Sequence, residues 1–203
     1  MDDKSAFLQL KEDEREIRKA IIIKATFKLL KKKVFHKIGM RDIAREAGVS
    51  AASIYRYFPS RDDLFVESLI QEIKKIKTKL KKTLTFNNTL DDLAFAVIDY
   101  LIDNEATFQL MCHFLIRDEI NQRVQKKFNA TQTYFINLFD KAVQTTEKKS
   151  ELFFSHAFFA TLTGVVLTYI HYPNITKEQK REYMYNLVSI IIKTENQGLI
   201  IKK

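Results

Sequence analysis

Residues 40–61 read MRDIAREAGVSAASIYRYFPSR, and this segment has the clearest local pattern in the chain. Ile43, Ala44 and Ala47 recur at i, i+1 and i+4, a spacing that places three apolar side chains on one face of a helix. Gly48 follows, and glycine adopts the left-handed conformation of a helix C-terminus without steric cost. The first half of the segment therefore predicts a short helix that ends at Gly48.

A second short helix is predicted directly after this turn. Ser50 is suited to be its N-cap, because a serine hydroxyl accepts a hydrogen bond from a free amide of the first turn. The helix is expected to run from Ala51 to Tyr57, with Pro59 ending it. Two short helices joined by a glycine-containing turn form the helix-turn-helix pattern, whose second helix enters the DNA major groove. The alternative is an ordinary pair of amphipathic helices in an all-α core.

The second helix has one apolar side and one side suited to DNA. At about 100° per residue, Ile54 and Phe58 lie toward the first helix. Small and polar side chains lie opposite, flanked by two phenols: Ala52, Ser53 and Arg56, with Tyr55 and Tyr57 beside them. Small side chains permit close approach, while hydroxyl and guanidinium groups bind phosphates and base edges.

A third helix is predicted to begin just after Pro59. Ser60 is its candidate N-cap, and Asp63 lies three residues further on, as in a capping box. Arg61 falls in the first turn, where the helix dipole disfavours a cation. Its presence there indicates a nearby anion, such as a DNA phosphate.

These residues resemble the DNA-binding domain of the TetR family of bacterial transcriptional regulators. The resemblance rests on IIKATF at residues 22–27, RDIAREAGVS at 41–50, IYRYFPSR at 54–61, and Leu64-Phe65, and residues 22–69 are about a quarter of the chain. Two positions depart from the family pattern. Val34 stands where a glycine usually ends the preceding helix, and Ile38-Gly39 replaces a pair of threonines. Gly39 can still serve as an N-cap, but it offers no side-chain oxygen to a phosphate.

The resemblance implies a role for each matching residue. Arg41 would reach a guanine edge or a phosphate, and Ala51 and Ala52 would face the bases, where methyl groups suit thymine. The phosphate contacts would come from Ser53, Tyr55, Tyr57 and Arg61, with Arg56 on either a base or a phosphate. The resemblance thus implies a double-stranded operator as the partner.

The charge of the chain is concentrated around this segment. The net charge is +9, and residues 1–85 hold 21 Lys/Arg against 12 Asp/Glu, whereas residues 86–203 hold 13 of each. Such clustering is typical of proteins that bind a polyanion. For the lysines between residues 74 and 82 the ordinary explanation is a solvated helix face. The single cysteine, Cys112, excludes an internal disulfide and, with no signal peptide in evidence, favours the cytoplasm.

The composition predicts an all-α protein. Four glycines and two prolines among 203 residues leave few breaks, so long helices with short loops are expected. Residues 15–33 should form the first firm helix, in which Ile17, Ile21, Ala25 and Leu29 make an apolar stripe that packs under the motif. Residues 1–15 are a charged, loose or helical extension. We expect a DNA-binding domain over residues 1–66 and a larger effector-binding and dimerisation domain over residues 67–203.

The last two predicted helices are expected to form a homodimer. Residues 152–172 contain no Asp, Glu, Lys or Arg, and residues 176–193 form a further amphipathic helix. A helix that is apolar nearly all round can lie in a four-helix interface, two helices from each subunit. Its length approaches that of a membrane span, but hydroxyl side chains interrupt it, so a membrane segment is the weaker interpretation.

A small, hydrophobic effector is the expected ligand of the larger domain. Apolar and aromatic side chains there could line a pocket, and the candidates are Phe95, Tyr100, Phe108, Met111, Phe114, Tyr134, Phe135 and Phe158. His113 and His156 could add polar contacts. For any single one of these residues, a place in an ordinary core is the simpler explanation.

The function that follows is a ligand-responsive transcriptional regulator, a repressor by the common habit of the family. No paired histidines, glycine-rich phosphate loop or Gly-x-Ser-x-Gly elbow is present, so we expect no enzyme activity, no metal and no cofactor. The alternative is a helical adaptor protein whose basic face binds an acidic partner.

Overall fold

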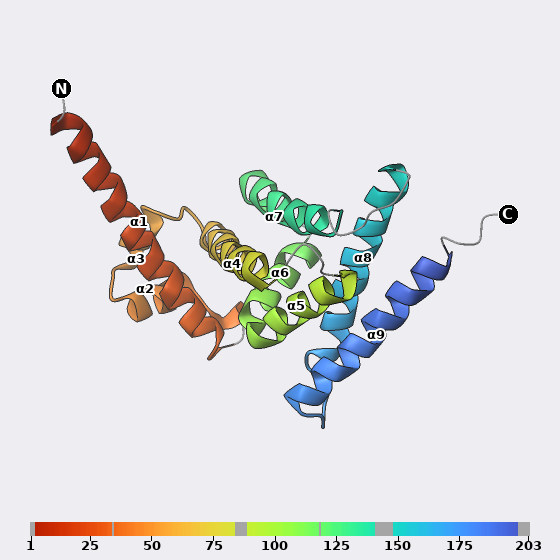
Figure 1. Ribbon diagram of the computed structural model, residues 1–203. Coiled ribbons are helices and arrows are strands. Elements are labelled where there is room, and N and C mark those ends of the chain that lie inside the picture. Colours follow the sequence, from red (N-terminus) through yellow and green to blue (C-terminus); the bar gives the residue numbers. More distant parts are fainter. Residues whose placement is uncertain (1–2, 34, 84–88, 118, 141–147, 199–203) are drawn as a thin grey trace. The chain divides into compact units, whose positions relative to one another are not determined.

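The computed structural model describes residues 3–33, 35–83, 89–117, 119–140 and 148–198 (Figure 1). Helices and loops make up these ranges, and no strand occurs in them, which confirms the all-α prediction. The elements in chain order are α1 (Asp3–Leu30), the 3-10 helix η1 (Phe35–Lys37), α2 (Met40–Ala47), α3 (Ala51–Tyr55), α4 (Arg61–Thr83), α5 (Leu90–Asp103), α6 (Glu105–Ile116), α7 (Gln122–Asp140), α8 (Lys148–Tyr169) and α9 (Lys177–Gly198).

The chain forms two compact units. Unit 1 consists of residues 1–72 and 106–127, and unit 2 consists of residues 73–105 and 128–203. Unit 1 therefore contains the helix-turn-helix segment together with most of α6 and the start of α7. The functional division into residues 1–66 and 67–203 stays a prediction.

The core of unit 1 is formed by the motif and the helices around it. Ile43, Ile54, Leu64 and Phe65 are fully buried, and Phe58 is nearly so. Burying an aromatic or branched side chain of this kind stabilises a fold by roughly 1.5–3 kcal/mol. The apolar face of the motif thus holds α2, α3 and the start of α4 together.

Helix α1 is longer than predicted and packs along only part of its length. Ile22, Ala25, Leu29 and Leu30 are buried. Ile17 and Ile21 are exposed, so our expectation that they pack under the motif is wrong. In Figure 1 the N-terminal turns of α1 extend past α2 and α3, and the described residues of the unit leave the side chains of residues 5–18 exposed.

Unit 2 is built from α5, α8 and α9 with the adjoining parts of α4 and α7. Its apolar core includes Ile98, Phe139, Phe158, Val166 and Met184, all fully buried. Polar contacts align α9 with α5. They join Arg181 Nε to Asp99 Oδ1 at 2.9 Å, the Tyr185 hydroxyl to the same oxygen at 2.5 Å, Ser189 Oγ to Asp91 Oδ1 at 2.7 Å, and Lys177 Nζ to Asp103 Oδ1 at 2.7 Å.

Helix α8 contains the uncharged segment that raised the membrane alternative. Its first residues, Lys148 and Lys149, carry charge, and it also includes the fully buried Ser155. Among the helices in the described part of the chain, none has both the length and the apolar character needed to span a bilayer.

Candidate nucleic-acid interface

The turn between α2 and α3 has the predicted geometry. Gly48 lies in the left-handed region with φ 69° and ψ 29°, and the amide of Val49 donates to the carbonyl of Ala44 at 2.9 Å. A Cβ added to Gly48 would meet no atom within 4 Å, so glycine is favoured by backbone conformation rather than by lack of space. The prediction that the first motif helix ends at Gly48 is confirmed.

Ser50 starts α3 as expected. Its Oγ accepts a hydrogen bond from the amide of Ser53 at 3.0 Å, and the two serine hydroxyls lie 2.9 Å apart. Helix α3 ends at Tyr55, slightly earlier than predicted, because the amides of Tyr57 and Phe58 both turn back to the carbonyl of Ile54. Pro59 restricts only Phe58, the residue before it, so the proline does not set this earlier end.

The outer face of α3 is open to solvent. Ala52, Tyr55 and Arg56 are exposed, with half of the Tyr55 surface accessible, while Ala51, Ser53 and Tyr57 are half-buried. Arg41 is exposed in the first turn of α2. All of these predicted DNA contacts belong to unit 1, and Ala52, Tyr55 and Arg56 lie together on one side of the short helix. Their contacts with DNA stay a prediction.

Arg61 has an intramolecular environment that the sequence did not indicate. Its guanidinium donates to the carbonyl of Ile38 at 3.4 Å and lies 5.6 Å from the ring centroids of both Phe35 and Phe65. The two rings lie against each other with centroids 4.8 Å apart, and a cation over their faces is stabilised by the electrons of the rings. These contacts give a reason for a cation in the first turn of α4, independent of a phosphate.

Asp42 supplies the carboxylate half of a capping box at the start of α2, while the hydroxyl half is missing. Gly39 is the N-cap, with extended φ −99° and ψ 166°, and its amide donates to Asp42 Oδ2 at 3.1 Å. Lys33 Nζ and Arg45 Nη2 donate to Asp42 Oδ1 at 3.1 and 2.8 Å. The hydrogen bond from Gly39, followed by that from Lys33, holds the pKa of the Asp42 carboxyl below its usual range.

Sequence reasoning missed Asp42, Lys33, Arg45 and Arg18 as members of this surface. An acidic residue three positions after an N-cap was the available signal for Asp42. Arg18 belongs to α1, and its pKa is raised first by Glu14 and then by the Tyr57 hydroxyl, which places it beside a predicted phosphate contact. Lys33 precedes the motif and is not part of its sequence pattern, so its position beside α2 is known only from the fold.

The surface around the motif is strongly basic. Residues 18–61 hold twelve Lys/Arg and two acidic residues, Asp42 and Glu46. Glu46 is paired with Lys28 at 2.5 Å, and this hydrogen bond keeps the pKa of Glu46 below its usual range. Both carboxylates therefore stay ionised, and a positive excess of ten remains for a polyanion.

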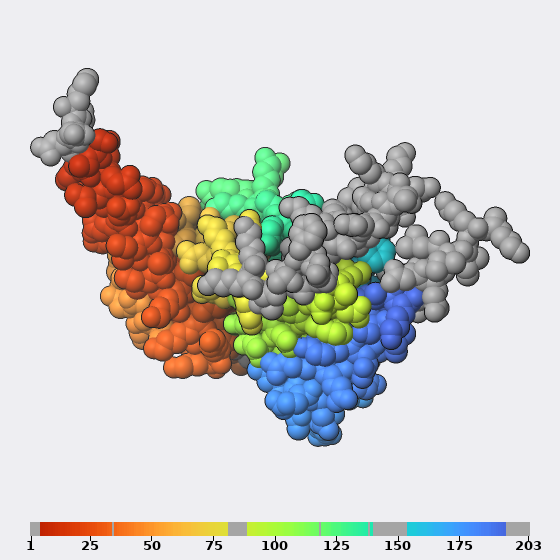
Figure 2. Space-filling view, in the orientation of Figure 1, coloured from red at the N-terminus to blue at the C-terminus, as the bar shows by residue number. Residues whose placement is uncertain are grey.

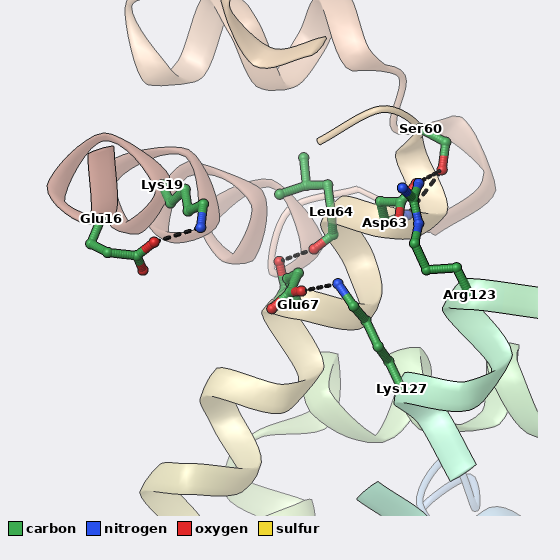
Figure 3. A network of polar contacts seen from close by, with 9 residues as sticks. Glu16, Lys19, Ser60, Asp63, Leu64, Glu67, Arg123 and Lys127 are labelled. Atoms are coloured by element: carbon green, nitrogen blue, oxygen red, sulfur yellow. Dashed lines mark hydrogen bonds and ion pairs between the residues drawn. The ribbon is translucent and has the colours of Figure 1, made fainter. Parts of the chain in front are cut away.

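Three ion pairs join the first turns of α4 to α6 and α7 within unit 1. Arg123 Nη2 contacts Asp63 Oδ2 at 2.7 Å, and Figure 3 shows the same carboxylate bonded to Ser60. Lys127 is paired with Glu67, and Arg117 Nη1 contacts Asp62 Oδ2 at 2.7 Å. Asp63 is almost fully buried, so its pair with Arg123 is the least screened by water.

His113, expected as a polar contact for an effector, lies in this cluster instead. Its ring contacts that of Phe35 in a tilted arrangement, with centroids 4.2 Å apart, and its Nε2 is 3.3 Å from Arg117 Nη1. A guanidinium only donates, so Nε2 is the acceptor of a neutral imidazole. Burial is the main reason that the pKa of His113 is lowered, and Arg117 and Arg61 add to this against the opposing effect of Asp62.

The predicted effector residues are divided between the two units. Phe108, Met111 and Phe114 are buried in unit 1, whereas the other five belong to unit 2. Phe135 and Phe158 are core residues, and Phe95 stacks on Tyr185 with centroids 4.2 Å apart. Tyr134 is half-buried beneath the Lys77 ammonium, and its burial raises its pKa.

A small cavity lies between α4 and α5 in unit 2. Its volume is about 80 Å³, and it is lined by Ile76, Lys79, Leu80, Ala96, Asp99 and Tyr100. Tyr100 is thus the one predicted effector residue on the lining of this cavity. Ligand pockets are typically ~300–1,000 Å³, so this space is smaller than a typical effector site. Among the described residues, no group of three or more His, Cys, Asp or Glu side chains is placed to bind a metal.

The sequence matches known DNA-binding proteins. Residues 22–67 match the family described as bacterial regulatory proteins, tetR family. The chain is 27% identical over 136 residues to the nucleoid occlusion factor SlmA of Mannheimia succiniciproducens, covering 63% of this chain and 62% of SlmA. It is 38% identical over 68 residues to the HTH-type transcriptional repressor KstR of Mycolicibacterium smegmatis, covering 34% of this chain and 33% of KstR. The matched part thus spans less than two thirds of either relative.

Solved structures share the fold. A transcriptional regulator from Rhodococcus sp. Rha1 aligns with a TM-score of 0.70 and 16% identity, covering 87% of this chain and 96% of that one. A putative transcriptional regulator from Saccharomonospora viridis, in complex with choline, aligns with a TM-score of 0.66 and 14% identity, covering 84% and 95%. The matched segment lies on the helix-turn-helix of unit 1. Residues 22–67 therefore match the TetR family of bacterial regulatory proteins, and the fold of solved transcriptional regulators extends beyond them over most of the chain.

Proposed function

We propose that this protein is a DNA-binding transcriptional regulator that acts as a homodimer and releases its operator when a small molecule binds. The observation that carries the proposal is the exposed face of α3, where Ala52, Tyr55 and Arg56 lie together within the most basic part of the chain. On such a face the alanine allows close approach to DNA, the phenol can bind a phosphate, and the guanidinium can reach a base edge. Residues 1–66 would bind DNA, and residues 67–203 would bind the effector and dimerise.

Repression is the sign of regulation that we propose. It is supported by the similarity to KstR, which is described as a transcriptional repressor. We place the protein in the cytoplasm, where bacterial operator DNA lies. The regulators of this family are typically not enzymes, and we propose no enzymatic activity for this chain.

The dimer would form through α8 and α9. Ala157, Ala160, Gly164 and Leu167 recur at helical spacing on the exposed side of α8, and a Cβ at Gly164 would meet no atom within 4 Å. Helix α9 exposes Tyr183 and Ile190 seven residues apart. Two uncharged exposed stripes on neighbouring helices suit a four-helix interface. A dimer would also present two copies of α3 to half-sites about 34 Å apart.

The effector is proposed to be small and hydrophobic, bound by the larger domain. The regulator from Saccharomonospora viridis supports ligand binding in this fold, since it was solved with choline. In the described part of unit 2, Tyr100 and the apolar side chains of Ile76 and Leu80 offer a starting cavity that a ligand would have to widen. The effector would then change the position of α4, which runs from the DNA-binding unit into unit 2.

Replacing Tyr55 by Ala tests the DNA-binding proposal. DNA selected by the protein from a random pool would be labelled, and binding would be measured by fluorescence anisotropy. Loss of the phenol should weaken binding about tenfold, the equivalent of ~1.4 kcal/mol. Tyr172→Ala is the matched control, because Tyr172 is equally exposed but lies outside unit 1. Equal affinities of wild type and Tyr55→Ala would argue strongly against the assignment.

The salt dependence of the same binding distinguishes a regulator from an adaptor protein. Each cation that neutralises a phosphate adds about 0.9 to the slope of log affinity against log salt, so an operator complex should show a steep slope. Arg56→Ala should lower that slope by nearly two for a dimer that presents two copies of Arg56. An adaptor with a basic face would show no preference among DNA sequences.

A further inference from the structure

Helix α1 begins with a segment that contributes no buried residue to the core of unit 1. Every residue from 5 to 18 is exposed, and this segment, which we call the arm, precedes the residues matched to the TetR family. Figure 2 shows the arm in red, standing away from α2 and α3. Helical turns without packing partners are only marginally stable in water, so a helical arm of this length is expected to have a partner.

One face of the arm, continued one turn further to Ile21, is an apolar seam. Phe7, Leu10, Ile17 and Ile21 are each between 49% and 66% exposed. With Glu14 they recur at steps of three, four, three and four residues, which is the a/d spacing of a coiled coil. At about 100° per residue these five side chains fall within roughly 80° of one another, while the exposed Leu8 lies outside them.

Charges on the two sides of the seam differ in sign. Lys11 and Arg18 occupy the positions on one side, and Asp13 occupies the other. In a parallel pair of identical helices, residue 13 of one faces residue 18 of the other, so Asp13 would meet Arg18 of a second copy. An antiparallel pair would instead bring cations against cations. The charge pattern is therefore self-complementary only in the parallel arrangement.

The arm is poorly suited to DNA. The arm contains four acidic and three basic side chains, in contrast to the large positive excess of the motif surface. Without a positive excess, the arm lacks the charge that draws a helix to phosphates. A protein surface is the better partner. The arm of a second copy is such a surface, because its charges complement those of the first arm in the parallel arrangement.

We propose that the arm seam pairs in parallel with the arm seam of a second copy of this chain, as a short two-stranded coiled coil. Four apolar side chains per copy would leave water, and Asp13 would pair with Arg18 of the other copy on both sides. Glu14 would face Glu14 of the other copy at one central layer. Each Glu14 is bonded to Arg18 of its own helix, which reduces the repulsion, but the layer keeps the pairing weak and in register.

Disulfide trapping in the full chain tests the geometry. Cys112 is first replaced by Ser, and cysteine is then introduced as Glu14→Cys in the seam or as Glu12→Cys on the outer side of the arm. In a glutathione redox buffer, the Glu14→Cys protein should form covalent pairs at several times the yield of Glu12→Cys. Equal yields at the two positions would overturn the proposal.

Sedimentation measurements on full-length variants test the energetics. Glu14→Leu should raise the association constant at least tenfold over wild type, because it replaces a like-charge layer by an apolar one. Asp13→Arg should weaken association, and Asp13→Arg combined with Arg18→Asp should restore it. All these variants keep the same surfaces outside the arm, so differences in association between them report on the arm. Circular dichroism would verify that each variant remains folded. If Glu14→Leu weakens association or leaves it unchanged, or the double variant fails to recover it, the arm binds something other than itself.

Discussion

At the scale of single residues, a carboxylate side chain organises a basic surface in a way that the sequence did not indicate. Asp42 holds the amide of Gly39 and gathers Lys33 and Arg45, so an acidic side chain orders part of a basic surface. The two cations that it binds would face a phosphate with their positions already restricted, which lowers the entropy lost on binding. The amide of the N-cap glycine is thus bonded by a side chain three residues later.

His113 gives a prediction about pH. Its pKa is lowered in the folded protein, so between that value and the ordinary value near 6.5 the unfolded chain binds more protons than the folded one. The free energy of unfolding should therefore be highest above about pH 6.5 and should fall as the pH is lowered below it. Urea denaturation at several pH values between 5 and 7.5 would measure this slope.

His113→Gln should remove this part of the slope, because glutamine does not titrate. His36→Gln is the matched control, since His36 is an exposed histidine of the same unit. A slope that is the same in wild type and His113→Gln would show that burial of the imidazole does not contribute to the pH dependence.

At the scale of elements, α4 is held by residues far away in the sequence. Its first turns bind Arg117, Arg123 and Lys127, all more than fifty residues further along the chain. Figure 3 shows Arg123 and Lys127 reaching from α7 to Asp63 and Glu67. Any movement of the N-terminal part of α4 must therefore either break these ion pairs or move their partner residues with it.

The two α7 pairs should differ in strength because their carboxylates differ in exposure. Arg123→Ala leaves the buried Asp63 with Ser60 as its partner and should lower the free energy of unfolding by about 1–3 kcal/mol. Lys127→Ala removes the ion pair of Glu67, whose carboxylate is already partly solvated. This should lower the free energy of unfolding by less than about 1 kcal/mol. Urea denaturation of both variants, with Asp63→Asn and Glu67→Gln completing two double-mutant cycles, would measure the coupling energies. A coupling energy at Glu67 that equals or exceeds that at Asp63 would contradict this order.

At the scale of the whole molecule, dimerisation decides whether two copies of α3 can act together. Ile190 is well exposed on α9, and Ile190→Glu would place a charge in the proposed α8–α9 interface. We expect this variant to sediment as a folded monomer and to lose at least tenfold in affinity for a two-half-site operator. Asn129→Glu, the same change of charge on the exposed side of α7, should do neither. A dimeric Ile190→Glu protein would place the interface elsewhere.

The local features of this protein follow from the sequence alone. The all-α class, the end of α2 at Gly48, and the caps of Ser50 and Ser60 depend on backbone conformation and on hydrogen bonds between residues three or four apart. Those interactions are encoded within a short window. Periodicity likewise identified the inner residues of the motif, Ile54 and Phe58.

Tertiary structure decided which of the periodic faces are covered. Ile17 and Ile21 continue the stripe of Ala25 and Leu29, yet they are exposed, because the part of the unit that the structure describes does not cover this stretch of α1. Arg61 lies over the ring of Phe35, and His113 lies beside Asp62, through contacts between residues more than twenty positions apart in the chain. Helical spacing defines a face, but burial depends on whether a distant segment packs against it. For this reason the aromatic residues expected around one effector pocket are divided between the cores of two units.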